Sequence, residues 1–367
     1  MKVIEVKRSI FENNDKDAAS LREQLKGEKT FLLNLMSSPG SGKTSTLVPT
    51  VNELLKDYRV GVMEADIDSD VDAWTIADKT KAKVVQLHTG GMCHLDADMT
   101  RQGLKELGME DVDIAILENV GNLVCPAEFD TGAVKNAMIL SVPEGHDKPL
   151  KYPLIFTVCD ALIINKIDVL PYFDFDMDKV KEYAWKRNPN LKIFPISAKT
   201  GEGMEAWYSW LKEEADKEEA DRAAAAGVTK QIEAIGEVTL DKEAAVKAAR
   251  AAYDGLTEAQ KGYVSAETLK LLTDAEERIE ALKAEADRAA AEEVEKLISD
   301  IGEVTLESAG KIEAAEKAYA ALTEAQKALV KNYKTLTDAR AAYDKLKEEE
   351  DNKNEGGKTI TNSKYKV

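Results

Sequence analysis

Residues 37–44 read Ser37-Ser38-Pro39-Gly40-Ser41-Gly42-Lys43-Thr44, and this stretch lies between an apolar run and a segment of helical period. In such a strand-loop-helix unit, the backbone N–H groups of residues 40–44 wrap phosphates at the positive end of the helix. Lys43 is expected to bridge the β- and γ-phosphates, and Thr44 to offer its hydroxyl to Mg²⁺. A glycine-rich turn without a ligand is the alternative, and the flanking strand and helix count against it.

The loop belongs to a longer alternation of short apolar runs and helical segments, which extends from residue 31 to about residue 211. This alternation predicts an α/β fold of the P-loop NTPase class, with a mainly parallel sheet and helices on both faces. The predicted strands are residues 31–36, 60–64, 83–86, 114–117, 161–164 and 192–195. The predicted helices begin near Gly42, Asp70, Ala97, Asp178 and Gly203. Ligands of such sheets bind beyond the carboxyl ends of the strands, where the remaining motifs lie.

Two motifs further along the chain indicate which base the nucleotide carries. Asn165-Lys166-Ile167-Asp168 follows a predicted strand, and the Asp168 carboxylate can accept hydrogens from N1 and the 2-amino group of guanine. Adenine offers no such pair of donors. Ser197-Ala198-Lys199 ends the next strand, where a backbone N–H can reach guanine O6. A polar turn would explain the first motif alone, but three motifs in this order at strand ends favour a guanine nucleotide.

Acidic residues at two further strand ends complete the expected Mg²⁺ side of the site. Asp66 follows strand 60–64, and Glu118 ends the strand that leads into residues 119–121. Mg²⁺ keeps several waters and takes few protein ligands, so both carboxylates fit direct or water-mediated contact alongside Thr44. Gly121 is expected to give a backbone N–H to the γ-phosphate. The predicted catalytic set is Lys43, Asp66, Glu118 and Gly121, while Asp68, Asp70 and Asp72 are interpreted as solvated or helix-capping.

The cysteines raise the question of a second metal. Cys93-His94 follows two glycines and a methionine, and Cys125 lies four residues beyond Gly121. Thiolate and imidazole suit Zn²⁺ and Ni²⁺ better than Mg²⁺, although these groups fall one short of a closed tetrahedral site. A water or a second chain would have to supply the rest. Free cysteine is also often a small buried hydrophobe, which remains the alternative here and the preferred interpretation of Cys159.

Composition divides the chain and limits its partners. Every proline, cysteine and tryptophan of the 367 residues lies at or before Trp210, and the rest is rich in Ala, Glu, Lys and Leu. Two kinds of domain are therefore expected to join near residues 213–220. The formal net charge is −18, so no basic surface is expected for nucleic acid. We also expect no membrane span and no secretory signal, and hence a cytoplasmic protein.

The second half contains an internal repeat. Ile235-Gly236-Glu237-Val238-Thr239-Leu240 recurs from Ile301 to Leu306, an offset of 66, and the phrase from Leu256 to Lys261 recurs with the same offset. The copies slip by two residues after Val264 and Val330. Each copy has the apolar spacing of three helices, with Gly236 and Gly302 as helix stops. The predicted domains are residues 1–215, 219–284 and 285–350, followed by a disordered tail at 351–367.

Three segments together resemble the HypB family of hydrogenase nickel-incorporation GTPases: residues 33–44, Cys93-His94-Leu95-Asp96-Ala97, and residues 118–126, whose run Glu-Asn-Val-Gly-Asn-Leu-Val-Cys-Pro is specific to that family. The resemblance extends from about residue 3 to 211. It implies a homodimer that forms or tightens with GTP, and a Zn²⁺/Ni²⁺ site at the dimer interface with Cys93, His94 and Cys125 as ligands. It also implies nickel delivery to the large subunit of [NiFe]-hydrogenase with a small metallochaperone, HypA.

Some features depart from that family or leave alternatives. Residues 1–29 have neither Cys nor His, so the nickel storage of some members is not expected. The helical repeats are unusual for the family, resemble repeats of Gram-positive surface proteins, and are interpreted as a spacer or interaction arm. The urease accessory GTPase is an alternative, but its Cys-Pro-His motif is missing. A third interpretation is a scaffold whose weak GTPase positions the helical arm for a partner.

Overall fold

The computed structural model describes residues 6–360, and the chain divides into two compact units, Met1–Ala224 and Ala225–Val367. Helix α9 (Met204–Glu233) begins in the first unit and ends in the second. The division lies later than the expected junction because α9 continues to contact the first unit beyond Trp210. Ala215 is buried in its core, and Tyr58 donates a 2.6 Å hydrogen bond to Asp216. No helix of the described residues is both long and apolar enough to span a bilayer.

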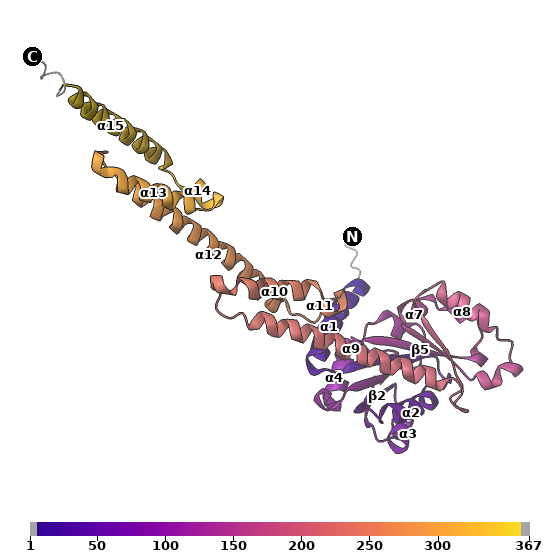
Figure 1. The fold of residues 1–367 in the computed structure, drawn as a ribbon. Helices are drawn as coiled ribbons and strands as arrows, with labels where there is room; N and C mark the ends of the chain where they lie inside the picture. Colours follow the sequence, from indigo (N-terminus) through magenta and orange to yellow (C-terminus); the bar gives the residue numbers. More distant parts are fainter. Residues whose placement is uncertain (1–5, 361–367) are drawn as a thin grey trace, which may run out of the picture. The chain divides into compact units, whose positions relative to one another are not determined.

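The first unit is built on a parallel sheet of seven strands, in the order β3-β2-β4-β1-β5-β6-β7. Figure 1 labels two of these strands, β2 and β5. The strands are β1 (Phe31–Ser37), β2 (Val60–Asp66), β3 (Lys83–His88), β4 (Ile114–Glu118), β5 (Lys135–Ser141), β6 (Ala161–Asn165) and β7 (Lys192–Pro195). The predicted fold class is therefore confirmed. Strand β1 lies at the centre, between β4 and β5, and the phosphate loop follows it directly.

Helices cover both faces of this sheet because its buried strands are apolar on both sides. One face packs against α2 (Lys43–Leu54), α3 (Val71–Lys79) and α9, in a core that includes Leu33 and Leu35. The other face carries two further clusters, of which Leu32 and Met36 are members. It is covered by α1 (Val6–Glu28), α4 (Ala97–Leu107), α5 (Cys125–Glu128), α6 (Lys148–Lys151), α7 (Pro153–Val158) and α8 (Met177–Trp185).

The α-helices and strands of the first unit that were not predicted from the sequence are helices α1, α5, α6 and α7 and strand β5. Helix α1 precedes the sheet and buries Leu21 and Leu25, four residues apart on one face, in the core beside α4. Strand β5 begins with the polar residues Lys135 and Asn136, which hide its apolar second half from a pattern search. Each predicted helix start agrees with a helix that begins within one residue of it.

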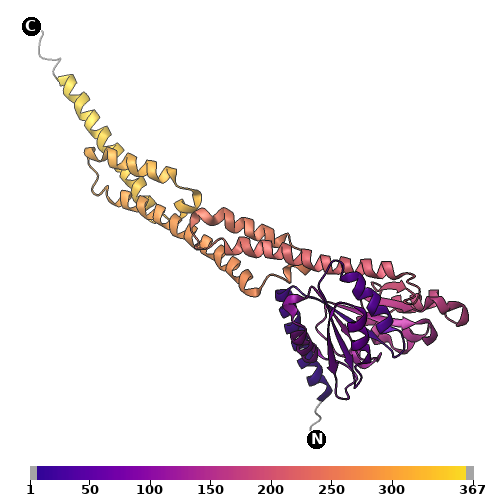
Figure 2. The same cartoon turned by 90° about the horizontal axis from the view of Figure 1, so that it is seen from below.

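In the second unit, helices pack around two apolar clusters that correspond to the two repeats. Figures 1 and 2 show these helices. The helices of this unit after α9 are α10 (Glu243–Asp254), α11 (Glu258–Lys261), α12 (Ala266–Ser299), α13 (Ala309–Ala321), α14 (Glu324–Leu329) and α15 (Tyr333–Ile360). Gly236 and Gly302 follow α9 and α12 with φ of 61° and 62°, the left-handed geometry of a helix stop. Helix α12 is continuous across residues 284–285, so it contributes to both clusters.

The expected disordered tail needs correction at its start. Helix α15 continues to Ile360 because Glu and Lys, which dominate residues 346–353, are favourable in helices. The remaining part of that expectation, residues 361–367, lies outside the described residues.

The two repeats contain the same inter-helix ion pair with its charges exchanged. In the first repeat Arg250 donates from Nε and Nη2 to the two Glu276 oxygens, at 2.7 Å each. In the second repeat Glu316 stands at the position of Arg250, and Arg340 at the position of Glu276. Arg340 Nε donates to Glu316 Oε1 at 2.8 Å, and Nη2 to Oε2 at 2.5 Å. Both pairs are bidentate, the geometry that makes an Arg-carboxylate contact most directional.

Exchanging the charges of the first pair tests whether the contact stabilises the helical unit. Arg250→Glu should lower the free energy of unfolding because two carboxylates then face each other, and adding Glu276→Arg should restore it. The pair is partly exposed, so the coupling should be about 1 kcal/mol or less. Urea unfolding followed by far-UV circular dichroism measures this coupling. Because no tryptophan follows Trp210, a transition that appears in circular dichroism but not in tryptophan fluorescence belongs to the helical unit. Additive effects of the two substitutions would contradict the prediction.

Candidate functional site

The phosphate loop is shaped by two glycines with left-handed backbone. Gly40 has a φ of 75°, and Gly42, which precedes the first residue of α2, has a φ of 97°. A Cβ atom at Gly42 would lie 2.5 Å from Asn165 Nδ2, so no other residue fits there. Backbone N–H groups at the start of α2 are thus free to face an anion.

The guanine motifs brace this loop from the end of β6, two strands away in the sheet. Asn165 Nδ2 donates to the Ser41 carbonyl at 3.0 Å, and Lys166 Nζ donates to the Gly40 carbonyl at 2.7 Å. Asn165 Oδ1 accepts from Ala198 N at 3.1 Å, which joins the third motif to the second. The three motifs therefore share one site. A cavity of about 730 Å³ is lined by members of all of them, including Gly40, Gly42, Lys43, Thr44, Lys166, Ala198 and Lys199.

Asp168 is held in place by the third motif. Ser197 Oγ, which is fully buried, donates to Asp168 Oδ1 at 2.7 Å. One carboxylate oxygen is thus fixed, and the second is left for a ligand. The geometry suits a group that must accept a hydrogen bond from a base in a defined direction.

Three carboxylates lie close together near Thr44, at the start of α2. Glu64 and Glu118 are directly paired across strands β2 and β4, and each continues the strand face that buries apolar residues further back. Asp72, on α3, accepts a 2.8 Å hydrogen bond from Thr44 Oγ1. One oxygen of each carboxylate lies within 4.8 Å of the others. Among the described residues, both Glu118 oxygens and Glu64 Oε2 are buried without a hydrogen-bond partner. Carboxylates left this way fit Mg²⁺, which takes hard oxygen ligands.

Burial has a strong effect on the protonation of these groups. Glu118 is fully buried, and the loss of solvation raises its pKa to about 8, against a smaller opposing effect from Lys43. Burial also raises the pKa of Glu64 to about 7. A bound divalent cation would reverse this preference by favouring the ionised forms.

The structure fixes one oxygen of Asp66 and brings Asp72 into the carboxylate cluster. Asp66 was expected to face Mg²⁺, but its Oδ1 accepts hydrogen bonds from the backbone N–H groups of Asp68 and Ser69, which hold its pKa below the ordinary value. Asp72 was interpreted as solvated or helix-capping, whereas it lies beside Thr44 and the two glutamates. The turn after β2 thus holds one Asp66 oxygen, and α3 places Asp72 beside Thr44.

Gly121, which was predicted to contact the γ-phosphate, lies against the phosphate loop. A Cβ atom at this position would lie 3.3 Å from Pro39 N and 3.4 Å from Lys43 Nζ. The next residues lead to Cys125, the first residue of α5. The position expected to sense the phosphate and one of the thiols therefore belong to the same short segment.

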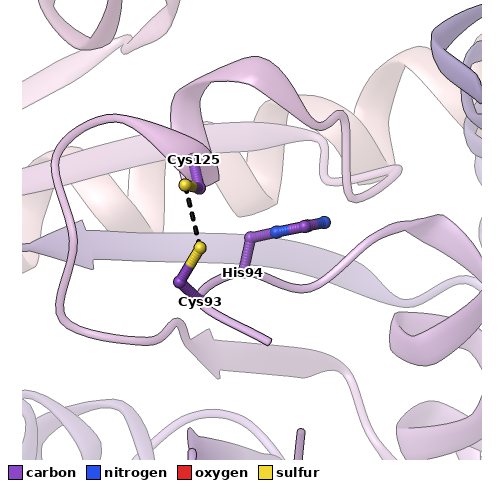
Figure 3. Close-up of side chains that lie close together, drawn as sticks. All are labelled: Cys93, His94 and Cys125. Atoms are coloured by element: carbon purple, nitrogen blue, oxygen red, sulfur yellow. Dashed lines mark hydrogen bonds between the residues drawn. The ribbon is translucent and has the colours of Figure 1, made fainter. Parts of the chain in front are cut away.

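The predicted metal ligands come together on this segment and the loop before α4 (Figure 3). Cys93 Sγ donates to Cys125 Sγ at 2.9 Å, and one ligand atom from each of Cys93, His94 and Cys125 lies within 4.8 Å of the others. The His94 ring stacks on Phe129 at 3.8 Å, and its buried Nδ1 has no hydrogen-bond partner among the described residues. Two sulfurs and an orphaned imidazole nitrogen fit a soft or borderline cation such as Ni²⁺ or Zn²⁺. Cys159 is buried in the core, as expected.

Comparison with known proteins agrees with this geometry. Residues 31–195 match the model of the CobW/HypB/UreG nucleotide-binding domain. The chain is 44% identical to hydrogenase maturation factor HypB of Rhizobium leguminosarum bv. viciae over 211 residues, which cover 58% of this chain and 70% of that protein. The chain belongs to the HypB family. A HypB family member of Helicobacter pylori strain J99, named hydrogenase/urease maturation factor, is 41% identical over 58% of this chain and 88% of its own length.

A solved HypB structure extends the likeness to three dimensions. The crystal structure of HypB from Helicobacter pylori in complex with nickel aligns with a TM-score of 0.53 and 41% identity, and covers 56% of this chain and 96% of that one. The shared part is thus the size of the first unit, which carries all the residues discussed above.

Replacing each aspartate by asparagine tests which one supports Mg²⁺. Asp72→Asn removes a charge beside Thr44 and should weaken Mg²⁺-dependent nucleotide binding about tenfold or more. Asp66→Asn is the matched control and should change it little, because an amide oxygen can still accept from the two backbone N–H groups. Titrating Mg²⁺ against a fluorescent guanine nucleotide measures both. A larger effect at Asp66 would contradict the assignment.

The raised pKa of Glu118 predicts a pH-dependent stability without metal. In the unfolded chain this carboxyl ionises near 4.5, whereas in the folded protein it stays protonated until about pH 8. Stability should therefore fall as the pH rises between these values, because only the unfolded state releases the proton. Glu118→Gln should make the fall of stability with pH shallower, because unfolding then releases about one proton fewer. Melting temperatures in EDTA at a series of pH values measure this, and parallel curves for the two proteins would contradict it.

Proposed function

We propose that the first unit binds and hydrolyses GTP and uses this cycle to deliver nickel during the maturation of a [NiFe]-hydrogenase. One observation carries the proposal: the thiol of Cys125, beside Cys93 and His94, lies on the same short segment as Gly121, which contacts the phosphate loop. A change at the nucleotide would thus reach a metal ligand directly. The names of the HypB relatives support the same conclusion.

The nucleotide chemistry follows from the loop and its braces. The N–H groups of residues 40–44 would hold the phosphates, Lys43 would neutralise the β- and γ-phosphates, and Gly121 N–H would contact the γ-phosphate. The free oxygen of Asp168 would accept the guanine donors, while Ser197 keeps the carboxylate oriented. Thr44, Glu118, Glu64 and Asp72 would hold Mg²⁺, which supplies charge neutralisation for the departing phosphate.

Nickel is the cargo in this proposal. Thiolates of Cys93 and Cys125 and the imidazole of His94 would bind it, and the same groups would accept Zn²⁺. Burial lowers the pKa of His94, which favours the unprotonated ring that a metal requires. Three ligands leave one position for water or for a second chain. A homodimer that forms with GTP would provide that second chain.

The proposed partners are a HypA-like metallochaperone as nickel source and the [NiFe]-hydrogenase large subunit as acceptor. Some family members carry urease in their names, but Cys125 here is followed by Pro126 and Ala127 rather than by Pro-His. The hydrogenase role is therefore preferred. The helical unit is proposed as an interaction arm, because no cysteine, histidine or tryptophan follows Trp210 to carry chemistry.

Metal binding by Cys93→Ala tests the nickel site in the full chain. The variant should lose nickel stoichiometry and bind at least about tenfold more weakly, because it lacks one of three ligands, while keeping GTP turnover. Cys159→Ala is the matched control, since it removes a thiol from the core and leaves the site intact. Lys43→Ala should instead abolish GTP turnover and keep nickel.

Two results would overturn the proposal separately. Equal nickel stoichiometry in Cys93→Ala and the parent protein, measured by elemental analysis after gel filtration, would remove the nickel role and leave the GTPase. Equal affinity for guanine and adenine nucleotides would remove the GTPase assignment instead.

A further inference from the structure

A chain of side-chain amides crosses the buried centre of the sheet. Asn119 Nδ2 donates to Asn34 Oδ1 at 3.1 Å, and Asn34 Nδ2 donates to Asn136 Oδ1 at 2.9 Å. Asn34 is 1% exposed and Asn119 is fully buried. Neither the phosphate loop nor the thiols use these groups. A buried amide lowers stability unless it is hydrogen-bonded, so its presence on an otherwise apolar strand needs a reason.

Asn34 occupies a distinct place on β1. Its neighbours on the same strand face, Leu32 and Met36, belong to two different apolar clusters. The amide therefore lies where one cluster ends and the next begins. Strand β1 leads from this residue into Ser37 and the phosphate loop, so Asn34 is fixed relative to the bound phosphates.

Asn119 is attached to β1 by both its backbone and its side chain. Its N–H donates to the Leu35 carbonyl at 2.9 Å, in addition to the contact with Asn34. Its Oδ1 accepts from Val120 N at 2.9 Å, which sets the direction in which the chain leaves β4. Asn119 is thus the fixed end of the segment that runs to Cys125.

The rest of that segment, residues 120–125, is held by apolar packing and by a hydrogen bond within the segment. Val120 and Leu123 pack into separate apolar clusters on either side of Gly121. Asn122 Oδ1 accepts from Val124 N at 2.8 Å and shapes the turn before Cys125. A displacement at Gly121 that Asn119 does not share can reach Cys125 through these packed side chains.

We infer that Asn34 is a positioning residue that couples the nucleotide site to the metal ligands. Its amide holds Asn119 in register with the strand that carries the phosphate loop, so that loss of the γ-phosphate moves Cys125 rather than Asn119. The inference rests on the proposed function, since it concerns GTP and nickel at those two sites. It assigns to Asn34 a role in their coupling free energy and none in either binding site.

Nickel affinity of the full chain with different nucleotides tests the role of Asn34. Competition with a chelator is measured for Ni²⁺ alone and with GTP analogue or GDP, and the ratio of affinities is the readout. We expect a ratio on the order of fivefold or more in the parent protein. Asn34→Leu, which fills the space without hydrogen bonds, should bring the ratio to within about twofold of one, while GTP turnover and nickel stoichiometry remain.

Matched variants separate coupling from packing. Asn136→Leu removes the other partner of Asn34 and leaves the contact with Asn119, so it should keep the parent ratio. Asn34→Asp should keep the ratio of nickel affinities close to that of the parent protein, unlike Asn34→Leu. A buried, protonated carboxyl can accept a hydrogen bond from Asn119 and donate one to Asn136. If Asn34→Leu does not fold, Asn119→Ala removes the same contact from the other side and should show the same loss.

The outcomes distinguish this inference from the proposed function. One nickel affinity in all nucleotide states of the parent protein would overturn the proposed coupling and the role of Asn34 with it. A clear ratio in the parent protein that persists in Asn34→Leu, or in Asn119→Ala, would overturn only the role of Asn34. A loss of the ratio in Asn136→Leu as large as in Asn34→Leu would show that packing is responsible, and would also overturn it.

Discussion

The contact between Gly42 and the Asn165 side chain is the constraint on which the first unit depends. The amide nitrogen lies 2.5 Å from where a Cβ atom of residue 42 would be, and it donates to the Ser41 carbonyl. The end of β1 and the end of β6 are thereby locked together, although β5 separates them in the sheet. Any ligand held by the loop is then placed at a fixed distance from the residues that follow β6. The loop that binds the phosphates and the residues that select the base are therefore held together as one rigid part of the site.

The buried strands also carry polar residues, and those at their carboxyl ends lie close to the phosphate loop. Apolar side chains fill the strands until the carboxyl ends, where Glu64 and Glu118 replace them beside the start of α2. A buried, unpaired carboxylate is destabilising, and the raised pKa values of these two groups express that cost. Functional sites commonly retain such groups because a ligand relieves them. Asn34 and Asn119 differ in being satisfied by each other, as expected of groups that position a segment rather than bind an ion.

Sequence patterns predicted the fold of the first unit and the loops that carry its motifs, because strand alternation and glycine-rich turns are local properties. Strand β5 escaped because Lys135 and Asn136 stand at its start. Asp72 and Glu64 could not be assigned from the sequence, since their meeting depends on β2 lying next to β4 and on the turn that holds Asp66. The contact between Asn34 and Asn119 depends likewise on the pairing of β1 with β4. These contacts could not be predicted because the sequence pattern does not show which strands are neighbours in the sheet.

The helical unit shows how a repeated sequence can still specify one arrangement. Two copies with the same apolar pattern offer each helix a second set of partners of nearly the same shape. The exchanged ion pair breaks this equivalence. If α10 of the first repeat packed against α15 of the second, Arg250 would face Arg340; if α13 packed against the first half of α12, Glu316 would face Glu276. Each wrong pairing places like charges together without hydrogen bonds, whereas each correct pairing is bidentate. Even a pair that adds little stability can therefore discriminate between alternatives, because the difference includes the repulsion in the wrong one.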